Sequence, residues 1–284
     1  MNLIKNLEIG NIKIREIGIL GAIWIFILHI LSDFLMIPVY IIEEIFSLNS
    51  SSIYFYVESM GSLIVKIIMI KWLLKRYSTK EEVGQKESRS ISKKYYIYTI
   101  LIVLGLRIVF DNSIGILVDQ VPVNESIEEA FNELFRYPVI AMISICVVAP
   151  IYEEIIYRGI ILKGLSRKYN DNIAVILSSL LFAVMHMNLH QGINAFLLGV
   201  VFGYLYLKTK SIYITMFAHF INNGIGIIVS SILVEFIKLS HNVVIIQSAV
   251  TAVGLIFMYK IIIWFRKNEI ILDEERLCES DAGC

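Results

Sequence analysis

The segment from Val139 to Arg158, VIAMISICVVAPIYEEIIYR, is the stretch of the chain that decides its fold class. It begins as an apolar run of the kind that crosses a bilayer, and it ends with two adjacent glutamates and an arginine. Ionisable side chains inside a membrane segment are costly, so a functional site is their default interpretation. We therefore predict a membrane helix that carries Glu153, Glu154 and Arg158.

The composition of the whole chain agrees with a membrane location. The 284 residues are 57% hydrophobic and only 18% charged, with a mean hydropathy of +0.73, well beyond an ordinary soluble domain. The net charge of zero gives no argument for nucleic acid as a partner. Cys146, Cys278 and Cys284 are not spaced as metal ligands or as a disulfide framework. We expect an integral membrane protein whose partners include lipids and no nucleic acid.

Eight hydrophobic runs are long enough, or nearly so, to cross a hydrocarbon core of roughly 30 Å. They predict an all-α fold, a polytopic bundle of about eight transmembrane helices. The fifth and sixth runs are short, so we expect them to be tilted, flanked by snorkelling side chains or buried inside the bundle. The predicted runs are Ile17–Ile37, Ile53–Leu74, Tyr95–Leu117, Val139–Ile156, Ile173–Met187, Ile193–Leu207, Ile212–Val234 and Val243–Phe265.

Basic residues predict how the bundle is oriented. In an eight-span arrangement the strongly basic connections all fall on one side, whereas the opposite side holds the acidic stretch from Asp119 to Glu133. By the positive-inside rule both termini are then cytoplasmic, in a multi-pass protein of a bacterial cell membrane. The first run lacks a small-residue cleavage site, so we expect a retained span. The basic connections are Lys75–Lys94, Arg158–Lys168, Lys208 with Lys210, and Arg266 with Lys267.

The same patterns divide the chain into five parts. We expect a cytoplasmic N-terminal segment at 1–16, N-terminal transmembrane helices at 17–137 and a catalytic core at 138–224. C-terminal transmembrane helices follow at 225–267, and a polar cytoplasmic tail occupies 268–284.

Two further motifs place polar side chains on later membrane helices. Phe182 to His186 reads FxxxH, and His219 to Asn223 reads HxxxN. Positions four residues apart share a helix face, so His219 and Asn223 are expected to face the same space. With about 1.5 Å of rise per residue, Glu153 lies about 8–15 Å below the cytoplasmic surface and His219 about 10 Å below it.

The depth of His186 does not fit this arrangement as well. It follows Ile173 by 13 residues, which places it about 20 Å deep. For His186 to meet Glu153, we expect Arg158–Asn172 to be partly embedded in the cytoplasmic leaflet as an amphipathic or re-entrant segment. The active site would then lie in the cytoplasmic half of the bundle.

Other polar side chains in the apolar runs have simpler explanations. His29 with Asp33 and Arg107 with Asp111 are spaced to satisfy each other at i and i+4. Lys66 lies deeper in its run, and it leaves open a second polar pathway.

The three motifs in this order resemble those of the CPBP family, also called Abi, whose intramembrane proteases include the Ras-converting CAAX endopeptidases. The resemblance covers about residues 139–224, where Gly199 and Gly203 add a small-xxx-small pair that lets helices approach closely. It implies that Glu153 is the catalytic carboxylate and that His186 helps it to activate a water. It implies an oxyanion hole lined by His219 and Asn223, and a supporting pair of Glu154 with Arg158.

Simple chemistry is compatible with these roles. A carboxylate in a pocket of low dielectric constant is suited to general-base and general-acid catalysis, and imidazole and amide donors can stabilise an oxyanion. The alternative is a zinc site formed by Glu153, His186 and His219 with a bound water. We favour catalysis without a cofactor, because the chain lacks HExxH and asparagine is a poor zinc ligand.

The favoured function is an intramembrane endopeptidase that cleaves a peptide or lipidated-protein substrate near the cytoplasmic face. CAAX-type peptides, bacteriocin precursors and signalling-peptide precursors all fit. One alternative is a non-catalytic bacteriocin self-immunity or scaffold protein of the same fold. Another is a proton-coupled transporter, which would predict an internal repeat that the two halves of the chain do not show.

Overall fold

The computed structural model describes residues 3–46, 52–79, 91–118, 120–121, 125–238 and 243–267. Every named element in these residues is helical, which confirms the predicted all-α class for the described part of the chain. The N-terminal half contains α1 (Leu3–Glu8), α2 (Ile19–Ser32), the 3₁₀ turn η1 (Asp33–Met36), α3 (Ile37–Phe46), α4 (Ser52–Tyr77), α5 (Lys93–Asp111), α6 (Ile114–Val118) and α7 (Glu125–Phe135).

The C-terminal half begins with one continuous rod of five consecutive helical stretches. These are α8 (Pro138–Ile143), the π-helical η2 (Ser144–Val148), α9 (Ala149–Glu154), the π-helical η3 (Ile155–Leu162) and α10 (Lys163–Leu165). The rod is followed by α11 (Asp171–Met185), α12 (Leu189–Thr209), α13 (Ile212–Lys238) and α14 (Val243–Lys267).

Each of the eight predicted runs falls on one helix or on consecutive helical stretches, but not every helix is clearly a membrane span. Among the described residues, four helical segments are long and apolar enough to cross a bilayer. The shorter apolar helix α11 joins them as a 15-residue segment. The structure therefore supports a multi-pass membrane protein without establishing eight crossings. The four segments are Ile19–Phe46, Pro138–Leu165, Gln191–Thr209 and Gln247–Lys267.

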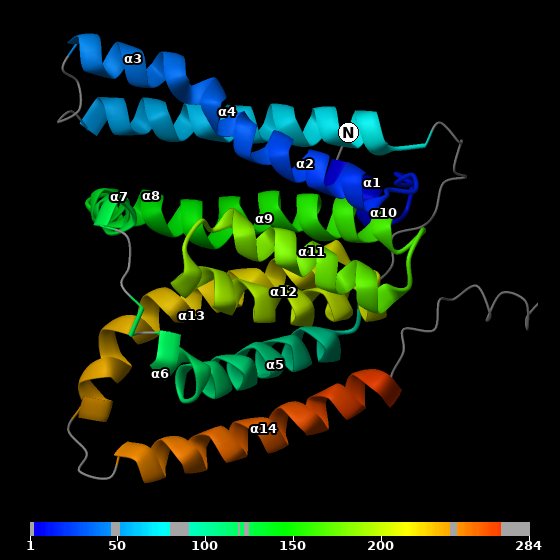
Figure 1. The fold of residues 1–284 in the computed structure, drawn as a ribbon, viewed down its shortest axis with the longest axis vertical. Coiled ribbons are helices and arrows are strands. Elements are labelled where there is room, and N and C mark those ends of the chain that lie inside the picture. The colour runs from blue at the N-terminus through cyan, green and yellow to red at the C-terminus, as the bar shows by residue number, and fades with distance from the viewer. Residues whose placement is uncertain are drawn as a thin grey trace, which may run out of the picture.

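The helices lie in layers around the central rod (Figure 1). Helices α2, α3 and α4 lie on one side of it, and α5 and α14 lie on the other side of α11, α12 and α13. Two apolar cores result, one of which centres on the rod, α2, α4 and α11. The second core is formed by α5, α12, α13 and α14. Helices α12 and α13 contribute to both cores and so connect the two sides of the bundle.

The close packing of α11 on α12 depends on two glycines, as predicted. A Cβ atom on Gly199 would lie 2.9 Å from the Ser179 Cβ, and one on Gly203 would lie 3.0 Å from a Val175 methyl. Real Cβ atoms essentially never approach as closely as the contact at Gly199, and the contact at Gly203 is tighter than most, so small residues here allow this helix spacing.

The predicted amphipathic or re-entrant segment at Arg158–Asn172 is wrong. The rod continues as a helix to Leu165, and Leu162 and Leu165 are fully buried. Arg158 and Lys163 interrupt the hydropathy pattern, but Arg158 is paired with an acidic side chain, so the helix does not have to end there. Glu153 is then twelve residues from the helix end, about 18 Å by helical rise.

The continuous rod also removes the difference in depth that the sequence implied. His186 follows the first residue of α11 by 15 residues, about 22 Å, which is similar to the depth of Glu153. No separate embedded segment is needed to bring the two to one level.

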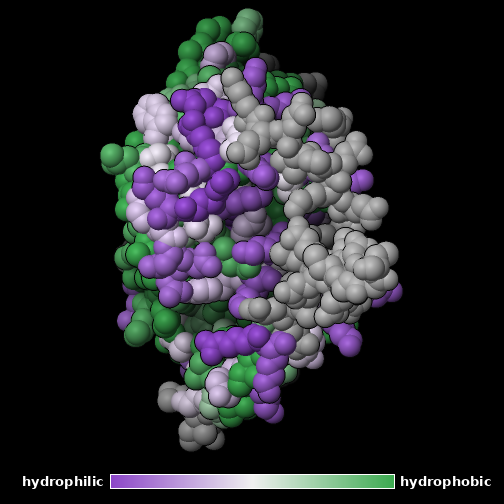
Figure 2. All heavy atoms as spheres, turned by 90° about the vertical axis from the view of Figure 1, so that its right-hand side faces the viewer, coloured by the Kyte–Doolittle hydropathy of each residue, from purple (hydrophilic) through white to green (hydrophobic). Residues whose placement is uncertain are grey.

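The basic ends of α4, α10 and α14 lie at the same end of the bundle as α1 (Figure 1). Seen from that end, hydrophilic side chains run down the middle of the face, and hydrophobic ones lie along its top and left edge (Figure 2). This distribution is the one expected where a membrane bundle meets water.

Candidate active site

Helix α13 is hydrogen-bonded to the rod at a backbone carbonyl for which the π-helical turn provides no N–H donor. In η2 the Ala149 N–H donates to the Ser144 carbonyl five residues back, so the next carbonyl, that of Ile145, would pair with residue 150. Residue 150 is a proline and has no N–H. The Asn223 side chain supplies the donor instead, with Nδ2 at 2.8 Å from the Ile145 oxygen.

A second side chain binds the rod in a similar way. Ser178 on α11 donates to the Tyr157 carbonyl in η3 at 2.8 Å. π-helical turns are often found at functional sites, and here each of the two carries a carbonyl that accepts from a neighbouring helix. The result is that α11 and α13 are both fixed to the segment that carries the two glutamates.

Glu154 and Arg158 form a fully buried ion pair one helical turn apart. Arg158 Nη1 is 2.9 Å from Glu154 Oε1, and the two side chains are 1% and 0% exposed. Arg158 Nη2 also donates to the Gly199 carbonyl on α12 at 3.3 Å. The guanidinium lies between two rings, 4.6 Å from the centre of Phe182 and 5.5 Å from that of Phe202. Every face of this cation is therefore occupied by a partner from the bundle.

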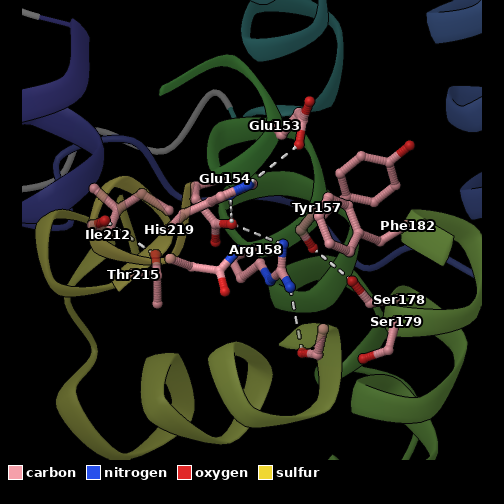
Figure 3. A network of polar contacts seen from close by, with 12 residues as sticks. Glu153, Glu154, Tyr157, Arg158, Ser178, Ser179, Phe182, Ile212, Thr215 and His219 are labelled. Atoms are coloured by element: carbon pink, nitrogen blue, oxygen red, sulfur yellow. Dashed lines mark hydrogen bonds and ion pairs between the residues drawn. The ribbon is translucent and has the colours of Figure 1, made fainter. Parts of the chain in front are cut away.

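His219 lies between the two glutamates (Figure 3). Its Nδ1 is 2.9 Å from Glu154 Oε1, and its Nε2 is 3.8 Å from Glu153 Oε2. The imidazole is almost fully buried, whereas the Glu153 side chain is 21% exposed. Glu154 is thus a buried anchor for the imidazole, and Glu153 is the carboxylate that an incoming molecule can reach.

The hydrogen bond to Glu154 also constrains the protons of His219. An ionised carboxylate only accepts, so Nδ1 must carry the hydrogen. A neutral ring then has a lone pair at Nε2, which can accept a proton but cannot donate one. For His219 to donate from Nε2 to an oxyanion, the ring must carry a hydrogen on both nitrogens.

His186 lies at the tip of the hairpin that joins α11 to α12, at the C-cap of α11. The next residue, Met187, has φ of 49°, which turns the chain sharply into α12. His186 Nδ1 is 2.9 Å from the Phe182 carbonyl, so it carries the hydrogen and leaves the lone pair on Nε2.

The edge of the Phe182 ring separates the two motif histidines. Its centre is 5.0 Å from that of His186 and 5.8 Å from that of His219. Among the described residues, no hydrogen bond or ion pair joins His186 to Glu153. The structure thus brings together four of the predicted site residues, Glu153, Glu154, Arg158 and His219. His186 contacts the Phe182 ring and does not reach Glu153. Asn223 is hydrogen-bonded to the rod.

The alternative zinc site requires Glu153, His186 and His219 to converge on one point. In the part of the chain that the structure describes, no group of three His, Cys, Asp or Glu side chains is arranged to hold a metal ion. Of the three predicted ligands, Glu153 and His219 Nε2 face each other at 3.8 Å, but His186 is in contact with the Phe182 ring and has no contact with either of them. The residues therefore fit a three-ligand zinc site poorly in this conformation.

The sequence did not reveal a second polar layer against the rod. His29 was expected to pair with Asp33, but its Nδ1 lies 3.2 Å from the Tyr157 hydroxyl, so that prediction is wrong. The His29 ring also meets the edge of Tyr152 at 4.9 Å, and Lys66 Nζ lies 5.8 Å from the centre of the same ring. A partner 128 residues away, as Tyr157 is from His29, leaves no periodic signal in a single sequence. Arg107 and Asp111, by contrast, do pair as predicted, at 2.8 Å.

An all-helical bundle with apolar outer helices and a buried Glu–Arg–His cluster defines a multi-pass membrane protein with a polar site inside it. Residues 135–225 match the family model described as type II CAAX prenyl endopeptidase Rce1-like. All six predicted site residues fall inside this range. The resemblance drawn from the motifs is therefore confirmed at the level of this domain.

Two named relatives support the same class. The chain is 32% identical over 105 residues to "Putative membrane peptidase YdiL" of Bacillus subtilis (strain 168), a match that covers 37% of this chain and 43% of that protein. It is 27% identical over 228 residues to "Membrane-embedded CAAX protease MroQ" of Staphylococcus aureus (strain USA300), covering 75% of this chain and 90% of that protein. The first match thus spans less than half of its relative, and the second spans most of it. No solved structure matches the chain. The comparisons support a membrane peptidase.

Proposed function

We propose that this protein is an intramembrane endopeptidase in which Glu153 activates the water that hydrolyses a peptide bond. The observation that carries the proposal is the contact of Glu153 with His219, whose other nitrogen is anchored by the buried Glu154–Arg158 pair. An accessible carboxylate beside a fixed imidazole is a suitable pair for proton transfer.

The reaction follows from these positions. Glu153 takes one proton from water as the oxygen attacks the peptide carbonyl carbon, and the carbonyl oxygen gains the negative charge. When the carbon–nitrogen bond breaks, Glu153 passes this proton to the leaving amine, and the products are a carboxylic acid and an amine, which then exist as a carboxylate and an ammonium group. His219 as an imidazolium, together with the second Asn223 amide hydrogen, would stabilise the oxyanion.

His186 has a separate place in this proposal. Its Nδ1 is bonded to the Phe182 carbonyl, which leaves the Nε2 lone pair for other partners, and the Phe182 ring contacts both His186 and His219. We assign it the second contact to the attacking water, which requires the hairpin tip to approach Glu153 when substrate binds.

An apolar groove beside His186 fits a substrate with a hydrophobic anchor. Its volume is about 490 Å³, within the range of ordinary ligand sites. Ala183, Val184 and Met187 line it next to the histidine, and Ile193 and Phe196 line it from α12. We propose that a membrane-embedded or lipidated part of the substrate lies here, with the cleaved bond near Glu153 and towards the cytoplasmic side.

The proposal is tested by comparing the peptide termini of membranes that carry the wild type or Glu153→Gln. The isosteric amide cannot accept the proton, so a precursor should accumulate in this variant alone. Glu133→Gln is the matched control, because Glu133 is an exposed carboxylate paired with Arg136 on α7. Identical termini in wild-type and Glu153→Gln membranes would show that Glu153 is not catalytic and would favour a scaffold role.

A further inference from the structure

A segment outside the matched domain contacts the rod and α13, two of the three helices that carry the motifs. Residues 3–17, which we call the N-terminal strap, cross the polar end of the bundle beside the start of α13 and the end of the rod. Figure 2 shows this end of the molecule. The predicted description of 1–16 as a cytoplasmic segment says nothing of such contacts.

The strap places an anion on the N-terminus of α13. Glu8 Oε2 accepts from the Ile212 N–H at 2.7 Å, and Oε1 accepts from the Ser211 hydroxyl at 2.5 Å. The Ser211 Oγ itself accepts from the Ile214 N–H at 3.3 Å, as an N-cap does. The first N–H groups of a helix lack partners within the helix and carry a partial positive charge, so a carboxylate here is favourable.

The neighbouring residue attaches the strap to the other motif helix. Leu7 is buried, and a Cβ atom on Gly159 would lie 2.8 Å from its Cδ2. Gly159 directly follows Arg158 of the buried ion pair. The same Cβ would lie 3.8 Å from the Ile212 side chain, so the strap, the rod and the first residue of α13 meet at one point.

Further along, the strap is bonded to the end of the rod. The Ile17 N–H donates to the Gly164 carbonyl at 3.0 Å, and Arg167 donates to the Ile14 carbonyl at 2.6 Å. The strap therefore fixes where α13 begins relative to the rod. His219 follows Ile212 by seven residues, about two turns, so a shift of α13 at Glu8 moves the imidazole against both glutamates.

We infer that Glu8 is a positioning residue for His219, acting through the first turn of α13; its effect on turnover rests on the function proposed above. Glu8→Ala removes both contacts to α13. Turnover should fall about ten- to a hundredfold with KM unchanged, since a misplacement of about 1 Å can cost that much. Glu8→Gln can still accept from the Ile212 N–H and should keep most of the activity.

Glu16→Ala is the matched control. Glu16 belongs to the same strap and pairs with Lys168 at 3.3 Å, but its side chain is 56% exposed. It should change neither turnover nor KM. Thermal unfolding of each purified full-length variant verifies that the protein is folded.

A second measurement does not depend on peptidase activity. In protein labelled with ¹⁵N-histidine, the ring signals of His219, assigned by their loss in His219→Gln, should move in Glu8→Ala and stay in place in Glu16→Ala. If the His219 signals move in Glu8→Ala but neither the wild type nor any variant cleaves a substrate, Glu8 does position His219 and the peptidase proposal fails. If folded Glu8→Ala leaves the His219 signals in place, or lowers turnover no more than Glu16→Ala does, the inference is overturned.

Discussion

Replacing Arg158 by methionine leaves the Glu154 carboxylate buried without its cation. Removing one partner of a fully buried ion pair costs about 3–5 kcal/mol, and both side chains here are at most 1% exposed. For a chain of this size, about 1 kcal/mol shifts the unfolding midpoint by about 2–4 °C. Arg158→Met should therefore lower the midpoint by roughly 6–20 °C.

A second variant separates stability from activity. In the double variant Glu154→Leu, Arg158→Met, apolar side chains replace both charges. Such a replacement of a whole buried ion pair is often neutral for stability. The midpoint should recover most of that loss, short of the wild-type value by the cost of about 1 kcal/mol for the unpaired His219 Nδ1–H. Because His219 has lost its anchor, peptidase activity should be lost.

The assay is thermal unfolding in detergent, together with turnover of the peptide identified in the Glu153→Gln comparison. Arg107→Met is the matched control, since Arg107 and Asp111 have the same i,i+4 spacing but side chains that are 22% and 38% exposed. It should shift stability by about 1 kcal/mol or less. A double variant as unstable as Arg158→Met, or one that retains wild-type turnover, would refute the reasoning.

Three further predictions follow from the contacts of the rod and of α13. Pro150→Ala supplies the missing backbone N–H, so Asn223→Ala should destabilise the protein by about 1 kcal/mol less in the Pro150→Ala background than in the wild type. A double-mutant cycle of thermal unfolding measures this difference. Equal costs in the two backgrounds would show that Asn223 and residue 150 do not share the Ile145 carbonyl. Cysteines introduced at Leu162 and Leu165, in a background without native cysteines, should resist a membrane-impermeant thiol reagent. The same reagent should label an exposed cysteine placed in the next turn. Full labelling of both buried positions would contradict the continuous helix. Activity should survive a strong chelator, and His219→Gln should retain measurable turnover; loss of activity to the chelator with rescue by added zinc, together with an inactive His219→Gln, would instead establish a metal site.

The helical architecture was predictable because membrane burial leaves a long, continuous signal. An apolar run of about 20 residues is almost sufficient evidence for a helix, since every backbone polar group in lipid must be bonded within the segment. The same reasoning found Glu153, Glu154 and Arg158, because charged residues stand out in an apolar run. It also found the Arg107–Asp111 pair and the approach of α11 at Gly199, which depend only on positions along one helix or on one small residue.

The end of the rod was predicted incorrectly because hydropathy counts a charge without knowing its partner. The charges from Arg158 onward indicated an amphipathic or re-entrant segment, but Glu154, Gly199 and two aromatic rings neutralise or cover the Arg158 guanidinium inside the bundle. His29 was assigned to Asp33 for a similar reason, because only a local partner is visible in a sequence.

The sequence by itself determined that the chain is helical and that it belongs in a membrane, and it singled out a few residues as candidates for chemistry there. Only the tertiary structure decided that His219 joins the two glutamates, that Asn223 replaces the N–H missing from Pro150, and that Glu8 caps α13. Glu8 and Ile212 are separated by 204 residues. Contacts of this kind depend on how helices pack, which follows from the complementary shapes of many side chains at once and not from the periodicity of any one segment.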